Sequence, residues 1–257
     1  MERILFEAKM LTSTFMRLVS IVSIIDDDFK MGYDKDGIIL RVMDDEHVSL
    51  FALDIPKDEL ISWFCPQQGV CEFALREIKN IILPKGAAVI TLKAYTTEKL
   101  GNYILSIVNE EIGENKEITE TLTLTIPVTI EEGSLPKIPS VLANTSVVFV
   151  NKDLLGDLQK IRIVSDYVSL IAGKKLTLKS DKSDSEDLEG NPELTIVKNV
   201  KCNGIGIGTY NIEYILPILR IIEGKFEIKW DSEKPLQILF EIEDSIGIYF
   251  LAPKVVR

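Results

Sequence analysis

Few residue patterns in this sequence have the types and spacing that catalysis or metal binding needs. The three cysteines, Cys65, Cys71 and Cys202, fit neither a zinc site nor a redox C-x-x-C pair, so we expect free and mostly buried thiols. The chain has one histidine, His47, which excludes a His/His or Cys/His metal cluster and allows Ser-His catalysis only through that residue. We therefore predict no metal site, no cofactor and no catalytic residue.

Two further patterns look like ligand sites but have simpler interpretations. The run Gly204-Ile-Gly-Ile-Gly208 is not a nucleotide fingerprint, because Thr209 stands where a glycine would be needed and no βαβ unit follows. Alternating glycine and isoleucine instead favours a strand with one apolar face. The acidic triplet Asp26-Asp-Asp28 could bind a cation, but a solvated turn between a helix and a strand explains it better. An enzyme therefore has little support in the sequence.

The overall composition is acidic. The chain has 257 residues, with 29 Lys and Arg against 40 Asp and Glu, which gives a net charge of −11. Affinity for nucleic acid comes from basic residues that neutralise phosphates, so the distribution of charge has to decide whether DNA is a partner. No apolar run reaches the roughly 18 to 20 residues of a membrane span, and the N-terminus lacks the pattern of a signal peptide. We expect an intracellular protein with no membrane partner.

The elements that would position these residues follow one order in each half of the chain. In the first half, Leu11, Phe15, Leu18 and Val22 recur at helical spacing and predict an amphipathic helix. After a tight turn that ends at Gly37, we expect two strands around a polar turn, then a second helix and two more strands. The expected ranges are 38–43 and 48–55 for the first strands, 73–83 for the helix, and 88–93 and 102–108 for the last strands.

The second half repeats this order, with Glu77-Ile78 matched by Glu213-Tyr214, which indicates a duplicated domain. A helix is expected to begin near Asn151, with an apolar face that includes Leu154 and Leu158. The polar stretch 180–192 predicts a mobile loop. A last helix is expected over 210–222, and strands over 147–150, 167–172, 175–179, 225–230, 236–242 and 246–251.

Prolines separate the two halves. Pro127, Pro136 and Pro139 should block strand pairing and hold this segment extended. The segment is therefore interpreted as a linker that crosses the outside of the molecule. We predict an N-terminal domain over residues 1–126, an interdomain linker over 127–140 and a C-terminal domain over 141–257.

Basic residues are concentrated on the four predicted helices. Over residues 11–22, 73–85, 151–162 and 210–220 there are eight basic residues and four acids, a net +4, while the rest of the chain carries −15. A solvated helix face is the simpler alternative, but the asymmetry suggests one cationic surface on an acidic body. The eight basic residues are Arg17, Arg76, Lys79, Lys85, Lys152, Lys160, Arg162 and Arg220.

Three parts of the chain carry distinctive motifs. Residues 36–50 read DGIILRVMDDEHVSL, the chain opens with Phe6-Glu-Ala8, and it closes with Lys234-Pro-Leu-Gln-Ile238 and Tyr249-Phe-Leu-Ala-Pro-Lys254. These segments resemble proliferating cell nuclear antigen, the sliding clamp of eukaryotes and archaea, in the family's order and spacing. With the duplicated halves, the resemblance covers essentially the whole chain.

The resemblance implies an α+β DNA-clamp fold, with two duplicated domains that have outer antiparallel sheets and inner helices, joined by an extended interdomain linker. It implies a DNA polymerase processivity factor that encircles duplex DNA as a trimeric ring and tethers replication and repair enzymes. Such a ring needs weak, sequence-independent phosphate contacts that permit sliding. The implied partners are double-stranded DNA, DNA polymerase, flap endonuclease, DNA ligase, a clamp loader and other clamp subunits.

The resemblance also assigns residues to DNA contact. Lys79 and Arg220 match basic positions on the family's inner helices, and Arg17 matches one near its first helix. Lys152 and Lys160 are placed by helix phase, and Arg76 belongs to the same basic set. The first helix lacks several further lysines of the family, and Pro217 would kink the last helix at a cost of about 3 kcal/mol if it lies in the helix interior.

A second implied site lies under the interdomain linker. In the family, partner proteins insert a short motif, a Gln followed by an aliphatic residue and two aromatic residues, into an apolar hollow. An adaptable methionine, a small alanine and rigid prolines suit such aromatic anchors. Ordinary strand core is the alternative for several of these residues, and His47 is expected at the rim. The matching positions are Met43, His47, Val48, Leu50, Leu135, Ile138, Pro139, Pro235, Tyr249, Ala252 and Pro253.

Some alternatives stay open at this point. The chain could instead be a subunit of a specialised or checkpoint clamp, or a scaffold that recruits partners without encircling DNA. The ring could hold three identical chains or related ones, joined by edge strands at 116–124 and 193–198. Rich Ile, Lys and Glu usage points to an archaeal source, so the protein would act on DNA in the cytoplasm or nucleoid, or in the nucleus of a eukaryote.

Overall fold

The computed structural model describes residues 2–79, 88–97, 103–113, 115, 117–131, 134–141, 143–150, 153–181 and 192–254. The chain divides into two compact units that exchange short segments. The first unit comprises Met1–Met43, Phe51–Ile138 and Ile242–Ile246, and the second comprises Asp44–Leu50, Pro139–Glu241 and Gly247–Arg257.

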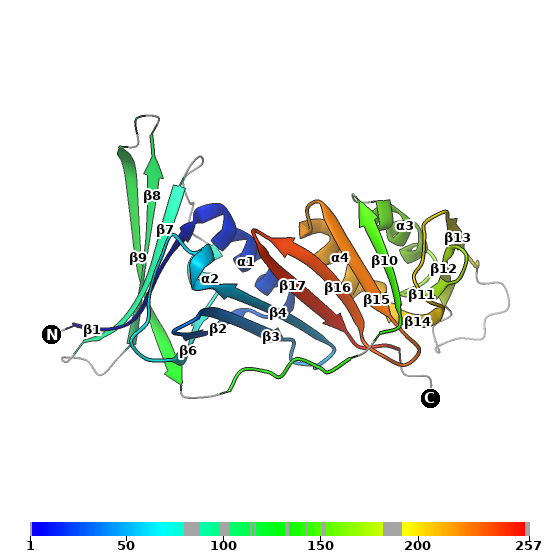
Figure 1. Ribbon diagram of the computed structural model, residues 1–257, viewed down its shortest axis with the longest axis horizontal. Coiled ribbons are helices and arrows are strands. Elements are labelled where there is room, and N and C mark those ends of the chain that lie inside the picture. The colour runs from blue at the N-terminus through cyan, green and yellow to red at the C-terminus, as the bar shows by residue number, and fades with distance from the viewer. Residues whose placement is uncertain are drawn as a thin grey trace. The chain divides into compact units, whose positions relative to one another are not determined.

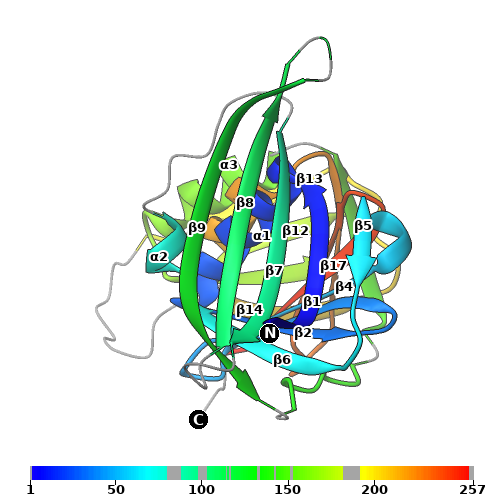
Figure 2. The same ribbon diagram turned by 90° about the vertical axis from the view of Figure 1, so that its left-hand side faces the viewer.

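The first unit is built on a large antiparallel sheet. Its strands follow the order β4-β3-β2-β6-β9-β8-β7-β1-β5, and Figure 2 shows β9, β8, β7 and β1 side by side. Buried and less buried side chains alternate along β8, as expected of a sheet with one covered face, whereas most residues of β3 and β4 are buried. The bounds are β1 Glu2–Leu11, β2 Asp28–Asp34, β3 Gly37–Met43, β4 Ser49–Pro56, β5 Ser62–Phe64, β6 Gly69–Ala74, β7 Ala88–Thr97, β8 Tyr103–Ile112 and β9 Ile118–Glu131.

Three helical segments belong to the first unit: α1 Thr12–Ile25, the short 3-10 turn Lys57–Glu59 and α2 Arg76–Lys79. The predicted apolar face of α1 is confirmed for Phe15, Leu18 and Val22, which are buried, whereas Leu11 caps the helix and is exposed. Phe15 packs near Phe29 of β2 with ring centroids 6.2 Å apart. This aromatic contact joins the helix to the sheet.

The predicted tight turn before β3 is confirmed. The Asp34 carboxylate accepts hydrogen bonds from the backbone N–H groups of Asp36 and Gly37, at 2.7 and 3.2 Å. Gly37 has φ +146°, and a Cβ there would come within 2.1 Å of the Ile55 carbonyl oxygen. Only glycine fits this turn without displacing β4.

The second unit contains two antiparallel sheets and two helices. One run of strands has the order β10-β15-β16-β17, and a separate four-stranded sheet has the order β13-β12-β11-β14 (Figure 1). The helices are α3 Asp153–Arg162 and α4 Ile212–Ile221, and they pack against each other. The strands are β10 Thr145–Val150, β11 Tyr167–Ala172, β12 Leu176–Asp181, β13 Thr195–Lys198, β14 Gly206–Asn211, β15 Lys225–Trp230, β16 Leu236–Ile242 and β17 Ser245–Leu251.

Two predicted helices begin later than expected. Phe73 belongs to β6, where it stacks on Phe29 at 5.0 Å between ring centroids, and α2 begins only at Arg76. Tyr210 belongs to β14, and the Asn211 side chain caps α4 by accepting from the Glu213 N–H at 2.9 Å. In both places strand packing of an aromatic residue prevails over helical spacing, and at α4 a side-chain cap marks the helix start.

Pro127 is expected to block strand pairing, but it lies within a strand. Pro127 lies inside β9, opposite Ile104 of β8. In the described residues, β6 pairs with β9 only at residues 129–131. On that side of β9, Pro127 therefore has no neighbouring strand that would require a backbone N–H from it. A proline is tolerated at such an edge position. Residues 134–141 form neither helix nor strand.

The glycine and isoleucine alternation forms a strand as predicted, with its faces assigned differently. Gly206, Gly208 and Tyr210 of β14 are buried, whereas the Ile207 side chain is exposed. On the buried face of β14, the Tyr210 side chain lies over Gly208. A Cβ on Gly208 would come within 2.5 Å of the Tyr210 hydroxyl oxygen, so a larger residue there would displace the tyrosine. In the described part of the chain, no helix is long and apolar enough to cross a membrane.

Candidate DNA interface and partner site

The described residues of the four helices carry a surplus of positive charge. Within these bounds there are six basic residues and four acids, a net +2. The predicted +4 also counts Lys85 and Lys152, which lie outside the described residues.

Arg17 is the one charged residue of α1. The residue is half-buried, and its Nε and Nη2 atoms are shielded from solvent without a hydrogen-bond partner in the described structure. Two unpaired guanidinium nitrogens at a shielded position leave donors that an anion could satisfy. A phosphate contact at Arg17 would therefore need a small movement of the side chain.

The basic residues of α2 lie at opposite ends of a four-residue helix. Arg76 is exposed and forms an ion pair with the adjacent Glu77 at 3.5 Å. Lys79 is the last residue of α2, and its side chain is outside what the structure describes. An exposed ion pair such as Arg76–Glu77 contributes little stability.

Acidic residues pair with both described cations of α3. Lys160 is 67% exposed and lies 3.4 Å from Asp157, while Arg162 forms ion pairs with Asp166 and with Glu213 of α4. Lys198 of β13 also pairs with Asp157. The Arg162–Glu213 pair links α3 to α4. Arg162 therefore joins the two helices, whereas the described ion pair of Lys160 lies within α3.

The outward face of α4 carries Glu213, Pro217 and Arg220, which are spaced by four and three residues. Arg220 is exposed in the last helical turn, where a cation also complements the helix dipole. Pro217 does lie in the helix interior, yet the helix continues to Ile221. The missing N–H at Pro217 frees the carbonyl of Glu213 on this outward face.

The predicted partner site includes a tight turn between β3 and β4. The Asp44 carboxylate accepts hydrogen bonds from the N–H groups of Val48 and Ser49, and the N–H of His47 donates to the Asp44 carbonyl at 2.9 Å. His47 is exposed and has φ +56°, a left-handed conformation that is uncommon for residues other than glycine. The exposure of His47 agrees with its predicted place at a rim.

The end of the chain is fastened beside this turn. The N–H of Ala252 donates to the Val48 carbonyl at 2.8 Å, and the N–H of Lys254 donates to the Thr209 carbonyl at 2.8 Å. The Lys254 ammonium lies 3.1 Å from Asp181 and 4.9 Å from the Tyr167 ring centroid. Ala252 and Pro253 are half-buried, as is Pro235 at the start of β16.

Two predicted contact residues lie in the interior instead. Tyr249 is 1% exposed and Leu50 is 5% exposed. The Tyr249 hydroxyl donates to the Tyr214 carbonyl of α4 at 3.0 Å, and burial raises the pKa of Tyr249. For Leu50 this burial is the strand-core alternative that the sequence left open, and for Tyr249 the sequence did not indicate it.

The linker residues differ in their surroundings. Leu135 is half-buried against β2, where a Cβ on Gly32 would come within 2.6 Å of the Leu135 Cδ1 atom. Ile138 is 43% exposed, and Pro139 is exposed. Met43, the last residue of β3, is half-buried.

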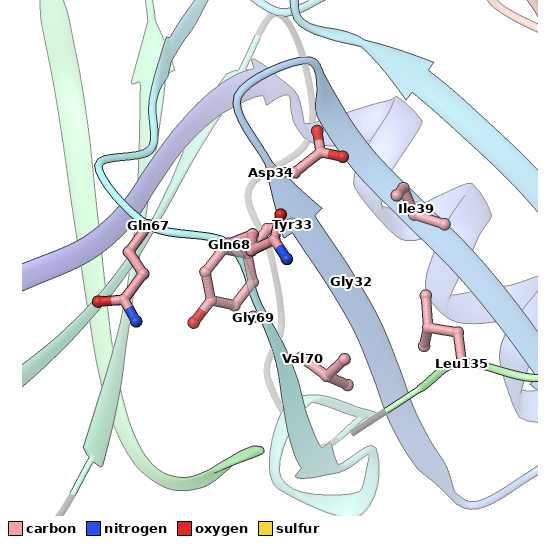
Figure 3. Close-up of a pocket in the computed structure, with 9 residues that line it drawn as sticks. All are labelled: Gly32, Tyr33, Asp34, Ile39, Gln67, Gln68, Gly69, Val70 and Leu135. Atoms are coloured by element: carbon pink, nitrogen blue, oxygen red, sulfur yellow. The ribbon is translucent and has the colours of Figure 1, made fainter. Parts of the chain in front are cut away.

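The first unit also has a cavity that the sequence did not reveal. It measures about 450 Å³, and Figure 3 shows Leu135, Ile39 and Val70 around the strands β2 and β6. Gly69 faces the Tyr33 ring, since a Cβ there would meet the Tyr33 hydroxyl oxygen at 2.5 Å. The glycines inside two strands are the signal that could have indicated this close approach. The lining residues are Gly32, Tyr33, Asp34, Ile39, Gln67, Gln68, Gly69, Val70 and Leu135.

Comparisons with known proteins agree with this geometry. Residues 5–126 match the family model described as proliferating cell nuclear antigen, N-terminal domain. The DNA polymerase sliding clamps of Nitrosopumilus maritimus and Thermoplasma acidophilum are 26% and 21% identical. The first alignment covers 93% of both chains, and the second covers 93% of this chain and 94% of the relative. The N-terminal part of this chain belongs to the sliding-clamp family of proliferating cell nuclear antigen.

Solved structures show that this clamp has the DNA-clamp fold. The proliferating cell nuclear antigen of Thermococcus kodakaraensis has a TM-score of 0.78 at 18% identity and covers 97% of this chain and all of its own. The clamp of A. fulgidus bound to the C-terminal region of FEN-1 has a TM-score of 0.75 at 14% identity, covering 98% and 99%. A PCNA2–PCNA3 complex from Sulfolobus tokodaii gives 0.74 at 16% identity, covering 96% and 99%.

Each unit of the clamp has a strand edge with no strand partner among the described residues. In the first unit, β9 pairs with β8 along residues 118–128 and reaches β6 only at residues 129–131. In the second unit, β13 is the terminal strand of its sheet and pairs with β12 alone. Both strands therefore present unused backbone donors and acceptors to solvent.

Proposed function

We propose that this sliding clamp is a subunit of a three-membered ring that encircles duplex DNA and tethers replication and repair enzymes to it. The observation that supports the ring most directly is the pair of open edges, β9 in one unit and β13 in the other. Antiparallel pairing of β9 of one chain with β13 of the next is a head-to-tail contact. Such contacts close into a ring when the rotation between subunits permits it.

The alternation of side chains on these edges suits pairing. On β9, Leu122 and Leu124 are half-buried between exposed threonines, and on β13, Ile196 alternates with the exposed Val197. An added strand would cover these apolar side chains and satisfy the backbone groups together. The edge at residues 116–124 falls partly outside the described residues, because residue 116 is not described.

DNA contact in this proposal is weak and independent of sequence. Arg76, Lys160 and Arg220 are exposed on α2, α3 and α4, and neighbouring acids limit their net attraction for phosphates. A small surplus of positive charge gives a shallow, salt-sensitive interaction, which favours sliding over fixed binding. The ring itself, rather than affinity, would keep the clamp on DNA. The clamp would thus act inside the cell, without catalysis of its own.

Partner enzymes would dock on the second unit through the turn at Asp44–Ser49 and the chain end at Ala252–Lys254. Val48, Pro235, Ala252 and Pro253 are half-buried, and the flanking turn is held by hydrogen bonds. A relative of this fold is solved with the C-terminal region of FEN-1, which supports a flap endonuclease as one partner. DNA polymerase, DNA ligase and a clamp loader are the further partners we propose.

Native mass spectrometry of the isolated chain tests the ring. A mass of three chains supports a homotrimer. The relative solved as a PCNA2–PCNA3 complex makes a mixed ring the variant to test, by adding related clamp subunits from the same organism. A chain that stays monomeric alone and with those subunits would contradict the ring and favour a scaffold that does not encircle DNA.

A further inference from the structure

Two tyrosines connect α4 to the turn that carries the proposed partner site. The Tyr214 hydroxyl of α4 donates to the Glu46 carboxylate at 3.0 Å, although the two residues are 168 positions apart. The Tyr249 hydroxyl of β17 donates to the Tyr214 carbonyl at 3.0 Å. All three residues belong to the second unit.

The buried tyrosine also reaches the turn itself. Because Tyr249 donates its hydroxyl proton to Tyr214, the Ser49 hydroxyl is the donor in its hydrogen bond with Tyr249, and the Ser49 backbone N–H donates to the Asp44 carboxylate. One network therefore runs from the backbone of α4 through Tyr249 and Ser49 to Asp44. A second link, between Tyr214 and Glu46, reaches the residue next to His47 on the outside.

We propose that Tyr214 and Tyr249 are positioning residues that fasten the Asp44–Ser49 turn to α4, so that the partner site is held ready for its ligand and responds to changes in this helix. The helix also carries Arg220, one of the proposed DNA contacts, on its outward face. A phosphate or a substitution that shifts α4 would then shift the turn. This inference rests on the proposed function, because it concerns the same partner site.

The Tyr214 hydroxyl remains a hydrogen-bond donor at neutral pH. Desolvation, together with the hydrogen bond to Glu46, raises the pKa of Tyr214 to about 12. The hydroxyl therefore stays protonated at neutral pH and can only be lost by substitution. His47 is held at φ +56°, and a turn released from its two links would be free to relax from this conformation.

The chain provides its own reporter for this turn, because His47 is its single histidine. Its imidazole ring protons give one set of signals in a proton NMR spectrum, with no need for assignment. Tyr214→Phe and Tyr249→Phe remove one hydroxyl each without changing charge. We expect both variants to shift or broaden the His47 signals. Tyr103→Phe, which removes a hydroxyl from β8 in the first unit, should leave them unchanged.

Peptide binding supplies the second readout. For a synthetic peptide with a Gln, an aliphatic residue and two aromatic residues, each Tyr→Phe variant should bind about two- to tenfold more weakly than the parent. Glu46→Ala should weaken binding like Tyr214→Phe, and the double variant should be no worse than either, because both remove one hydrogen bond. Glu46→Gln keeps an oxygen acceptor and should restore binding.

The outcomes separate this inference from the proposed function. If both Tyr→Phe variants keep the parent His47 signals and the parent peptide affinity, the positioning role is wrong. Additive losses in the Tyr214→Phe/Glu46→Ala double variant would also contradict it. If the parent protein binds no such peptide, the proposed partner site fails, while the His47 signals still report whether the two tyrosines hold the turn.

Discussion

The backbone N–H of Ala252 donates to the Val48 carbonyl at 2.8 Å. This bond fastens the end of β17 to the turn after β3, two segments that are far apart in the sequence. The half-buried Ala252 methyl group therefore has a fixed place beside Val48, next to the prolines of the proposed partner site. Because the backbone makes the bond, a side-chain substitution at Ala252 preserves it.

Ala252→Arg should block partner binding while the fold remains intact. A long cationic side chain would fill the space next to Val48 and put a charge where aromatic anchors are expected to bury, at a cost of about 2 kcal/mol or more. Titration calorimetry with the Gln-aliphatic-aromatic-aromatic peptide measures the loss. Val148→Arg, at an exposed position of β10, is the matched control. Unchanged affinity of Ala252→Arg would place the peptide elsewhere.

Val197→Pro should separate the subunits without unfolding the chain. The Ser180 N–H donates to the Leu194 carbonyl, and the Leu194 N–H donates to the Ser180 side chain, so Ser180 and Leu194 face each other across the strands. Every second N–H then points at β12, which leaves that of Val197 on the open edge. A proline at position 197 therefore removes an N–H donor that only the strand of another subunit would use, and it leaves the pairing with β12 intact.

Size-exclusion chromatography and native mass spectrometry check this prediction. Val197→Pro should shift the chain towards the monomer and keep a cooperative thermal transition. Ile196→Pro is the internal control, because its N–H points at β12 and its loss should lower the melting temperature. A Val197→Pro protein that remains as fully assembled as the parent would exclude β13 from the subunit contact.

Replacing the basic residues of the helices should weaken loading on DNA rather than stability. Arg76→Ala/Arg220→Ala removes two exposed cations, so retention on DNA should be weaker than in the parent and should depend less steeply on salt concentration. The melting temperature should stay within a few degrees, because exposed ion pairs contribute little. Lys57→Ala/Lys174→Ala, which removes equal charge from exposed turns, is the control. Equal loss in both double variants would mean that only the total charge matters.

Alkaline pH should destabilise the first unit through Cys71. Burial raises the pKa of the Cys71 thiol from 9.0 to about 12. A folded-state pKa above the unfolded one favours the protonated form, so this contribution to stability is complete below pH 9 and is lost as the pH rises towards 12. The free energy of unfolding should fall by up to about 1.4 kcal/mol per pH unit in this window.

Urea unfolding of the parent and of Cys71→Ala at several pH values tests this effect. The variant should be less stable at pH 8 because of the cavity, but its stability should fall less steeply above pH 9. Tyrosine ionisation is common to both proteins and cancels in the difference. Parallel curves for the two proteins would show that folding does not change the pKa of this thiol, which would contradict the prediction.

Much of the fold could be predicted from the sequence where the local pattern and the tertiary packing agree. The strand 167–172 is found as β11 with the same bounds, and the predicted strand 38–43 gains only Gly37. Local reasoning failed at Phe73 and Tyr210, whose rings pack into sheets through contacts with distant residues. Such contacts have no signature at short sequence separation.

The candidate sites divide in the same way. The turn at Asp44–Ser49 and the exposure of His47 follow from local residue types, and the structure has both. The burial of Tyr249 and the cavity beside Leu135 depend on which strands become neighbours. The assignment of individual DNA and peptide contacts and the domain bounds 1–126, 127–140 and 141–257 stay predictions.

Retention on closed against linear DNA tests the central claim most directly. The clamp is loaded by its clamp loader onto a nicked circular plasmid, and the complex is then separated by gel filtration at moderate salt before and after a single cut with a restriction enzyme. A topological ring predicts that the clamp stays on the circle and is lost from the linear product, because its phosphate contacts are weak. Equal retention on both DNAs, or tight binding to a short duplex without a loader, would contradict the clamp.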